Sequence, residues 1–321
     1  MSKPVNIIIV NYNCWTYTVD CISSLLNSTN TNFNVFIVDN QSTDNSIYEI
    51  EKWSKKKQLP FAITTGKFEE IQDHLKSQIP LITLIKNDEN RGFGAGNNVI
   101  LKPLSKVLKE SFVWLLNPDT EVEKKVLEDL INLAEDKEKI MVGNSIYYFN
   151  DKNKIMYCGG FKVKKWIHGV VDIKKPEDID KIDAIAGASL FTNISTFHDL
   201  GFLPEEYFMY WEETDFCKYA KEQGYNFLVN TNSKIFDHVG VTSKTNFLRE
   251  YLYLLNGLKF YKKFYPKRST VIILSTMAKL LKAFFLSDKV KRRALLYAHI
   301  DFFKLLRGRA LDVKSRIKAN T

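Results

Sequence analysis

A carboxylate that directly follows an apolar run is the strongest chemical signal in this sequence. Residues 112–116 predict a buried strand, and the chain continues with Asn117, Pro118 and Asp119. In an α/β protein, side chains at the carboxyl end of a strand lie where ligands bind. This segment can place one or two oxygens on a divalent cation, whose other ligands would be phosphate and water. The same three residues also form ordinary turns, and the local sequence leaves both interpretations open.

Asp39 is a second carboxylate at the end of a predicted strand. It follows the apolar run 35–38 and is itself followed by Asn40, Ser42 and Asp44. Asp39 can accept hydrogen bonds from a nucleobase or a ribose, while Ser42 or Asp44 caps the next helix.

The first apolar run, residues 5–10, is followed by Asn11 and Asn13. A nicotinamide enzyme would carry G-x-G-x-x-G at this point, so we do not expect that class of enzyme. The two asparagines can contact a ligand or cap the next helix, and capping is the simpler interpretation of this pair alone.

A glycine-rich turn spans residues 90–98 and contains Arg91 and Asn97. Backbone N–H groups at the start of a helix attract phosphate, and Arg91 can add positive charge. A tight turn with helix capping produces the same pattern, so the segment alone is a weak signal.

Three acids, Glu212, Glu213 and Asp215, follow the aromatic run 207–211, which ends at Trp211. Acids in the first turn of a helix complement its dipole, which would be a purely structural role. An aromatic wall with a carboxylate at its rim also suits sugar binding and proton abstraction.

His238 follows a short apolar segment and can be a metal ligand, although a lone histidine is more often structural. Together, the polar clusters predict a site for a metal-chelated nucleotide diphosphate, with a side chain nearby that can act as a base.

The elements that would position these residues alternate between strand and helix, which predicts a mostly parallel sheet with crossover helices. Residues 54–80 are polar and interrupt the alternation, so we expect a surface insertion there. The second half is less regular, with the helix 214–223 closed by Gly224. The predicted strands are 5–10, 35–38, 81–85, 112–116, 226–229 and 234–236, with strands or hairpins at 139–149 and 156–171. The other predicted helices are 17–26, 42–53, 94–101 and 121–134.

The composition is that of a globular protein, with 45% hydrophobic residues in 321. Its four cysteines form no C-x-x-C pair, which favours a reduced, intracellular protein over a disulfide scaffold or a zinc module. The apolar run 5–10 is too short for a signal peptide.

Charge is distributed unevenly along the chain. Residues 244–321 contain 19 Lys and Arg against 4 Asp and Glu, a balance of +15, so residues 1–243 carry −6 of the total of +9. A basic tail on an acidic body indicates an anionic partner, either a membrane or a nucleic acid.

The tail is predicted to be helical from residue 247. Its central segment has too few apolar residues to span a bilayer, which takes about 18. It fits an in-plane amphipathic helix or a helix packed on the core. The basic clusters 262–263, 267–268 and 289–293 favour a membrane surface. Six residues share its apolar face: Val271, Leu274, Met277, Ala278, Leu281 and Phe285.

Seven motifs, in this order, resemble those of the family 2 glycosyltransferases, and the bacterial rhamnosyltransferase-like branch is the most similar. The resemblance covers residues 5–268; each motif is weak alone, but the ordered set is specific. The motifs are Asn11-Tyr12-Asn13, Val38-Asp39-Asn40 with Ser42 and Asp44, Asn90-Arg91-Gly92-Phe93 with Asn97-Asn98, Asn117-Pro118-Asp119, Gly187-Ala188-Ser189, Tyr210-Trp211-Glu212-Glu213-Thr214-Asp215 and His238.

The resemblance implies a GT-A fold, an α/β nucleotide-diphospho-sugar transferase domain, over residues 1–245 with the insertion 54–80. Residues 246–321 would be a basic, helical tail. It also implies a Mg²⁺ or Mn²⁺ cofactor, with Asp119 as the last acid of the family's D-x-D motif and His238 completing the metal shell. The implied nucleotide-binding residues are Asn11, Asn13, Asp39, Asn40, Arg91, Asn97 and Asn117.

Glu213 would match the family's catalytic base, with Glu212 and Asp215 in the same catalytic group. The family usually has Asp at the position of Glu213, which makes the choice between Glu212 and Glu213 less secure. Gly187, Ala188 and Trp211 would contact the donor or acceptor sugar.

The implied activity is inverting sugar transfer from dTDP-rhamnose or a UDP-hexose to a glycan or polyprenyl-diphosphate-linked acceptor in bacterial surface polysaccharide synthesis. The enzyme would be cytoplasmic, peripheral at the inner face of the plasma membrane, with no nucleic-acid partner. Alternatives are an inactive transferase-like membrane scaffold, a nucleic-acid-binding protein that uses the basic tail, and a nucleotidyltransferase.

Overall fold

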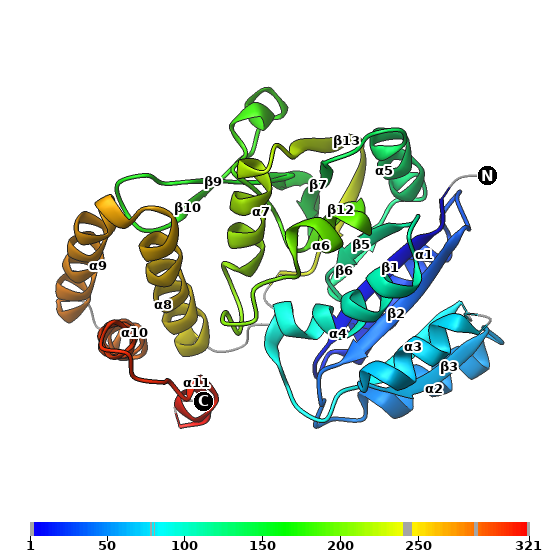
Figure 1. The fold of residues 1–321 in the computed structure, drawn as a ribbon, viewed down its shortest axis with the longest axis horizontal. Helices are drawn as coiled ribbons and strands as arrows, with labels where there is room; N and C mark the ends of the chain where they lie inside the picture. Colours follow the sequence, from blue (N-terminus) through cyan, green and yellow to red (C-terminus); the bar gives the residue numbers. More distant parts are fainter. Residues whose placement is uncertain (1–2, 78, 80, 240–245, 286–287, 320–321) are drawn as a thin grey trace.

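One sheet of ten strands forms the centre of the molecule, and a group of helices extends from one end of it (Figure 1). The structure is a computed structural model that describes residues 3–77, 79, 81–239, 246–285 and 288–319. From one edge to the other, the strands are β3 (Phe61–Thr65), β4 (Ile82–Lys86), β2 (Phe33–Asp39), β1 (Val5–Asn11), β5 (Phe112–Leu116), β12 (Ser189–Asn193), β7 (Ile140–Tyr148), β13 (Asn226–Asp237) and β6 (Thr120–Val122), with β8 (Asp151–Cys158) paired to β7.

The first five strands in this order are all parallel, whereas β12 runs antiparallel between β5 and β7. The carboxyl ends of β1, β2 and β5 therefore lie at one edge of the sheet, where ligands bind in open α/β folds. A smaller antiparallel sheet lies beyond this edge. It consists of β10 (Val170–Asp172), β9 (Gly160–Val163) and β11 (Ala184–Ile185), with a 3₁₀ helix, Pro176–Lys181, before β11.

Helices cover both faces of the central sheet because its strands are apolar on both sides. In β1, Ile7 and Ile9 belong to one buried cluster and Ile8 to the other. On the first face lie α1 (Trp15–Leu25), α2 (Ser46–Lys56) and α5 (Val126–Ala134). On the second lie α3 (Phe68–Lys76), α4 (Gly92–Val107), α6 (Ser195–Leu200) and α7 (Glu212–Glu222).

The alternating strands and helices predicted for the first half are confirmed, with two differences in the elements. The helix expected over residues 121–134 starts only at Val126, because Thr120–Val122 pairs with β13 as the strand β6. The two short strands expected at 226–229 and 234–236 form one strand, β13, whose register shifts between Asn230 and Ile235.

Residues 54–80, expected as a surface insertion, add a strand and a helix to the fold. β3 extends the sheet by pairing with β4, and α3 buries Ile71 and Leu75 in the second apolar cluster. These two residues are four apart, so they lie on one helical face that the overall polar composition of the segment obscured. Residues 78 and 80 lie outside the described part of the chain.

Four helices and a short 3₁₀ turn form the tail: α8 (Asn246–Phe264), the turn Pro266–Arg268, α9 (Ser269–Phe284), α10 (Lys289–Leu306) and α11 (Val313–Lys318). They surround a third apolar cluster that also includes Tyr207 and Trp211. In Figure 1 α9 lies at the end of the molecule farthest from α2 and β3. The domain boundary at 245–246 stays a prediction, and this aromatic packing crosses it.

Gly257 in α8 allows that helix to lie directly against the loop 164–169. A Cβ added at residue 257 would overlap the imidazole ring of His168. The hydroxyl of Tyr261, one turn later, donates to the carbonyl of Lys164 over 2.7 Å. The loop is therefore fixed to α8 by packing and by hydrogen bonds.

Candidate active site

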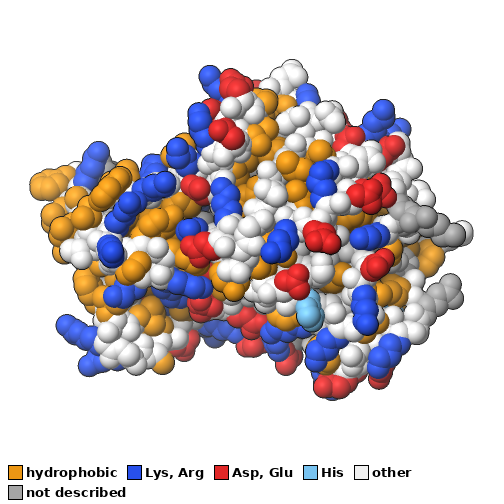
Figure 2. Space-filling model, turned by 45° about the horizontal axis from the view of Figure 1, so that its top comes forward, with side chains coloured by type: hydrophobic (Ala, Val, Ile, Leu, Met, Phe, Trp, Pro, Cys, Tyr) orange, Lys and Arg blue, Asp and Glu red, His pale blue; other side chains and the backbone are white. Residues whose placement is uncertain are grey.

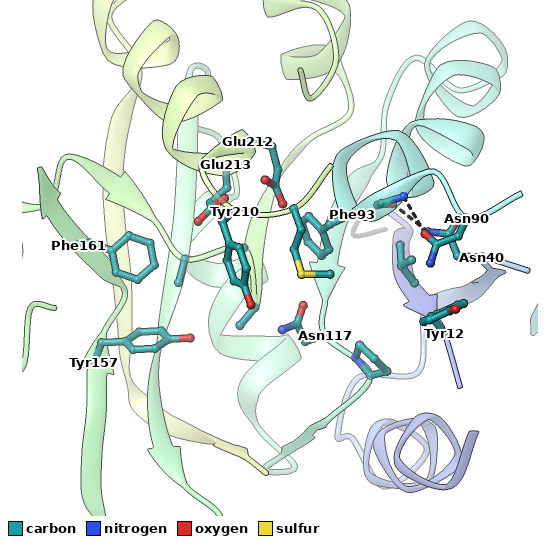
Figure 3. Close-up of a pocket in the computed structure, with 17 residues that line it drawn as sticks. Tyr12, Asn40, Asn90, Phe93, Asn117, Tyr157, Phe161, Tyr210, Glu212 and Glu213 are labelled. Atoms are coloured by element: carbon teal, nitrogen blue, oxygen red, sulfur yellow. Dashed lines mark hydrogen bonds between the residues drawn. The ribbon is translucent and has the colours of Figure 1, made fainter. Parts of the chain in front are cut away.

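A cavity of about 270 Å³ lies at the carboxyl ends of β1 and β5 (Figure 3). Its floor includes Asn117 and Pro118, which follow β5 directly. Gly187 and Ala188, which precede β12, also line it, as the resemblance implied for a sugar site. The apolar run before Asn117 thus carries this side chain to the ligand-binding edge of the sheet, as its sequence predicted.

The two sides of the cavity differ in chemistry (Figure 3). One side has Tyr12 after β1, Asn40 after β2 and Asn90 before α4. The other side has the rings of Tyr157 from β8 and Phe161 from β9. The first side offers amides and a hydroxyl to a polar ligand, whereas the second offers flat aromatic faces.

Glu212 and Glu213, the first two residues of α7, reach the cavity between its two sides (Figure 3). Glu212 is buried, and burial together with the charge on Glu213 raises its pKa well above the usual range. Burial raises the pKa of Glu213 to about 7. A carboxyl group with a pKa near neutrality is suited to proton transfer at physiological pH.

The turn that precedes these two acids has an unusual backbone. Tyr210 and Trp211 have φ angles of 70° and 79°, in the left-handed region that bulky residues rarely adopt. Such residues cost on the order of 1–3 kcal/mol each and persist only where their surroundings enforce them. Here Asn256 of α8 donates its side-chain N–H groups to the carbonyls of Met209 (2.8 Å) and Tyr210 (3.3 Å). A tail helix therefore holds the turn that aims the acids.

Trp211 and Asp215 do not line the cavity, and their roles in sugar contact and catalysis stay predictions. The indole N–H of Trp211 donates to the carbonyl of Tyr253 in α8 over 2.9 Å. Both carboxylate oxygens of Asp215 lie 2.8 Å from the ammonium of Lys263, and one accepts from the hydroxyl of Tyr207 over 2.9 Å. Two positions along a helix rotate the side chain by about 200°, so Asp215 faces α8 when Glu213 faces the cavity.

Asp39 is fully buried, and its carboxylate is engaged by neighbouring side chains. It accepts from the backbone N–H (2.9 Å) and hydroxyl (2.6 Å) of Ser42 and from the side-chain amide of Asn11 (2.8 Å). Capping of α2 comes from Asp44, which accepts from the N–H of Ser46 over 3.0 Å. Asp39 and Asn11 thus fix the ends of β1 and β2, and their direct contact with a nucleotide stays a prediction.

Asn40 and Asn13 act on the same loops. Asn40 lines the cavity, accepts from the amide of Asn87 (3.0 Å) and donates to the carbonyl of Gly92 (2.9 Å). Asn13 has a φ of 53° and accepts from the backbone N–H of Thr43 over 2.7 Å. The next helix, α1, has no side-chain cap among the residues described, so Asn13 does not cap it; its amide oxygen instead holds the loop before α2.

Arg91 and Asn97 do not line the cavity, and their direct contact with a nucleotide stays a prediction. The guanidinium of Arg91 pairs with Asp88 (3.1 Å) and Glu89 (3.6 Å), the two acids that precede it in the chain. The amide of Asn97 donates to the carbonyl of Phe93 one turn earlier, over 2.9 Å. The glycine-rich turn instead presents Asn90 and Phe93 to the cavity.

Asp119 follows β5 and Asp237 ends β13; neither lines the cavity, although Asn117 does. Asp119 is buried, and β6 pairs antiparallel with β13 so that Asp237 lies opposite Thr120. Burial and the charge on Asp119 raise the pKa of Asp237 to about 7. A cation between two such carboxylates would relieve their repulsion, and one or two carboxylates are what Mg²⁺ typically takes from a protein.

His238 lies next to Asp119 through its backbone, because its N–H donates to the Asp119 carbonyl over 2.9 Å. Its ring, however, stacks on Phe149 and places Nε2 3.1 Å from a carboxylate oxygen of Glu121. Within the described ranges, no three His, Cys, Asp or Glu side chains converge as a ready-made metal site. The role of His238 as a metal ligand therefore stays a prediction that requires its ring to turn from Glu121.

The sequence model described as "Glycosyl transferase family 2" matches residues 6–191, which is more than half of the chain. The chain belongs to this family. Among solved structures, the transferase is similar to GalNAc-T7 crystallised with UDP, GalNAc and Mn²⁺, at 13% identity and a TM-score of 0.58. That match covers 74% of this chain but only 43% of the longer GalNAc-T7 chain. No curated protein sequence matches.

Two further solved structures cover more of the transferase. Residues 1–349 of TarS from S. aureus match 94% of this chain and 80% of their own, at 15% identity and a TM-score of 0.54. The mannosyltransferase PcManGT from Pyrobaculum calidifontis, with GDP-Man and Mn²⁺, matches 99% and 79%, at 12% identity and a TM-score of 0.56. These similarities confirm the GT-A fold; the rhamnosyltransferase-like branch stays a prediction.

Several residues of this family 2 transferase site were missed in the sequence. Asp237 ends a strand as Asp39 does, so the same strand-end rule would have found it. Tyr157 in β8 and Phe161 in β9 lie far from any motif, and only the tertiary fold brings them to the cavity.

Proposed function

We propose that this protein transfers a sugar from a nucleotide-diphosphate donor to an acceptor hydroxyl and inverts the anomeric centre. The proposal rests on Glu213, a carboxyl group with a pKa of about 7 in the wall of a cavity that is polar on one side and aromatic on the other. Glu213 takes the proton from the acceptor hydroxyl as that oxygen bonds to the anomeric carbon. The bond from that carbon to the donor diphosphate breaks on the opposite face, through a transition state with oxocarbenium character.

The two sides of the cavity divide the substrates between them. The nucleotide would lie against Tyr12, Asn40 and Asn90, whose amides and hydroxyl suit a base and a ribose. The acceptor would lie against Tyr157 and Phe161, because sugar rings present C–H faces to aromatic surfaces. Glu213 stands between the two, where the transfer takes place (Figure 3).

Asp119 and Asp237, whose charges act on one another, are suited to hold a divalent cation, Mg²⁺ or Mn²⁺. Asp119 and Asp237 would hold it beside Asn117, with His238 as a further candidate. When bound, the cation neutralises charge that develops on the leaving diphosphate. Mn²⁺ is present in the GalNAc-T7 and PcManGT structures, which supports the proposal for this chain.

The donor and pathway are proposed from the motif resemblance. We propose dTDP-rhamnose or a UDP-hexose as donor and a glycan or a polyprenyl-diphosphate-linked sugar as acceptor, in bacterial surface polysaccharide synthesis. The GalNAc-T7 structure contains UDP and GalNAc, and the PcManGT structure contains GDP-Man. Both support a nucleotide-sugar donor for this chain.

A peripheral position at the inner face of the plasma membrane is supported by α9. The apolar face expected from its sequence, which includes Leu274, Leu281 and Phe285, is exposed. The helix packs inward through other residues, such as Ile272 and Thr276. Figure 2 shows hydrophobic side chains with Lys and Arg among them at the end where α9 lies in Figure 1. No helix in the described residues combines the length and hydropathy needed to cross a bilayer.

The test is a thermal-shift panel of UDP, dTDP, GDP and CMP, each with and without Mg²⁺ or Mn²⁺. A ligand that binds only the folded state raises its melting temperature, so one nucleoside diphosphate should stabilise the protein in a metal-dependent way. Glu213→Gln should keep this shift and lose sugar transfer from the matching donor. Near-wild-type transfer by Glu213→Gln would refute the base assignment, and no shift with any nucleotide would refute the donor class.

A further inference from the structure

A second cavity, of about 480 Å³, lies where α7, the loop 164–169 and the turn between α8 and α9 meet. Four cationic side chains from these three segments line it: Lys165, Lys218, Lys267 and Arg268. Aromatic residues at the end of α8, including Tyr265, complete the wall, and no acid lines it. This cavity is separate from the one that holds Glu213, with which it shares no lining residue.

The positive charge in this basic cavity is only partly balanced. Lys218 pairs with Glu222 over 2.7 Å. Arg268 stacks on the ring of Trp166, with 4.4 Å between the guanidinium carbon and the ring centroid, a contact that leaves its charge in place. Across the residues that the structure describes, Lys165 and Lys267 have no carboxylate within ion-pair distance. Like charges gathered around a hollow repel each other, and a bound anion would relieve that repulsion.

The loop that carries Lys165 is held in place by the tail. Lys279 of α9 donates to the carbonyl of His168 over 3.1 Å, and the N–H of Val170 donates to the hydroxyl of Tyr253 over 3.2 Å. His168 itself is buried against α8. Because the loop is fixed, little conformational entropy is lost when its lysine binds an anion.

The surroundings of the basic cavity are apolar and exposed. Trp166 and Ile167, next to Lys165, are 60% and 47% exposed. The exposed apolar face of α9 starts at Val271, three residues after Arg268. Tryptophan beside cations is typical of protein surfaces that meet the headgroup region of a membrane. A soluble anion would gain nothing from these apolar neighbours, whereas a lipid would contact them with its acyl chains.

We infer that the basic cavity binds the phosphate group of an anionic membrane lipid. Lysine and arginine form the strong, charge-assisted hydrogen bonds that phosphate oxygens accept. The inference rests on the proposed membrane attachment and adds a defined headgroup site to it. Trp166, Ile167 and the face of α9 would enter the bilayer surface around the bound phosphate.

The test compares vesicle flotation of the whole protein and two double variants. Lys165→Ala/Lys267→Ala removes two charges from the cavity, and Lys282→Ala/Lys289→Ala removes two exposed charges from the same tail outside it. One set of vesicles contains phosphatidylcholine with phosphatidic acid, and the other contains oleic acid instead, matched in zeta potential. Inorganic phosphate and a short DNA duplex are titrated separately by calorimetry, and each variant is checked for an unchanged melting curve.

The cavity variant should bind phosphatidic-acid vesicles about tenfold more weakly than the tail variant, since each contacting lysine contributes about 1 kcal/mol and the cavity adds direct phosphate contacts. Both variants should bind oleate vesicles equally. If both variants lost the same share of binding to phosphatidic-acid vesicles, the headgroup site would be overturned but the membrane attachment would stand. If the wild type did not float with either set of vesicles, the site and the attachment would both be overturned. Tighter binding of DNA or free phosphate than of lipid, lost only in the cavity variant, would also overturn it.

Discussion

At the scale of single residues, the function depends on two adjacent acids in different surroundings. Glu212 is buried although it lines the cavity, and its carboxylate Oε2 has no hydrogen-bond partner in the described part of the chain. Glu213 is only partly buried and lies against Gly187, where a Cβ would come within 3.5 Å of its Cγ. Both pKa values are raised, but only Glu213 is placed to exchange a proton with a substrate and titrate near neutrality.

Turnover should therefore rise with pH around 7. Burial raises the pKa of Glu213 to about 7, and a base must be ionised to accept a proton. Glu213→Gln should lower turnover by roughly 10²- to 10⁴-fold. The measurement is initial rate against pH at saturating donor. A rate that stays constant from pH 6 to 8 while chemistry limits turnover would contradict the assignment.

The stability of the unliganded protein should also depend on Glu212. Its pKa in the folded protein lies above the ordinary value of 4.5, so the folded state favours the protonated form. The stability it contributes is complete below about pH 4.5 and is lost as pH rises through the raised pKa. Glu212→Gln should therefore melt at least about 2 °C above wild type at pH 8 and at the same temperature at pH 4.5. Calorimetry checks this, with the exposed Glu138→Gln as control; an equal gain at both pH values would refute it.

At the scale of elements, α7 is positioned as much by the tail as by the sheet. Its start is held by Asn256 and Tyr253 of α8, and its first turn is tied to Lys263 of α8 through Asp215. The tail helix is therefore part of the apparatus that aims the acids, although none of its residues lines the cavity.

Asn256→Ala should test this arrangement. Without its two donated hydrogen bonds, the left-handed Tyr210 and Trp211 can relax and shift Glu213. A small misplacement of a catalytic group costs up to about 10²-fold in rate, so kcat should fall about tenfold or more while the donor KM changes little. The exposed Lys262→Ala on the same helix is the control. If the variant lowered the melting temperature but left kcat unchanged, Asn256 would only stabilise the fold and would not position Glu213.

The sequence predicted the first-half elements well because each has a strong local pattern. Residues 5–10 are apolar except for Asn6, residues 112–116 are apolar throughout, and each run is followed by a polar residue at the ligand edge. The positions of Asp215 and Trp211 outside the cavity lining could not be read from the sequence, because they depend on helix rotation and on a left-handed turn that α8 stabilises. No local pattern could place Tyr157 in the cavity, since only the pairing of β8 with β7 in the folded sheet brings it there.

At the scale of the whole molecule, charge and exposed apolar surface are concentrated in the tail. Residues 244–321 carry +15, and α9 exposes Leu274 and Leu281 by 60% and 64%. The sequence left open whether the apolar face of this helix packs on the core or faces outward. The structure has it facing outward, with the tail's own core built on α8 and α10 instead.

Leu274→Glu/Leu281→Glu should abolish flotation with anionic vesicles and leave the melting temperature nearly unchanged. Both side chains are exposed, so the change removes apolar contact with the bilayer and adds repulsion from anionic lipid without opening the core. The control is Tyr48→Glu/Ile63→Glu, which makes the same change in charge at two exposed residues at the other end of the molecule. Equal flotation of the two variants would rule out α9 as the attachment surface.

The packing of α8 against the loop 164–169 has a consequence for how this chain can vary. A glycine inside a helix ordinarily gains about 1 kcal/mol when it becomes alanine. At Gly257 the added methyl group would meet the ring of His168, and the loop and α8 would have to separate. In a saturation library selected for activity, position 257 should thus be among the least tolerant sites in the tail, and its surviving alleles should be temperature-sensitive. Gly257 does not line the cavity, yet its lack of a side chain would limit the temperature up to which the protein stays active.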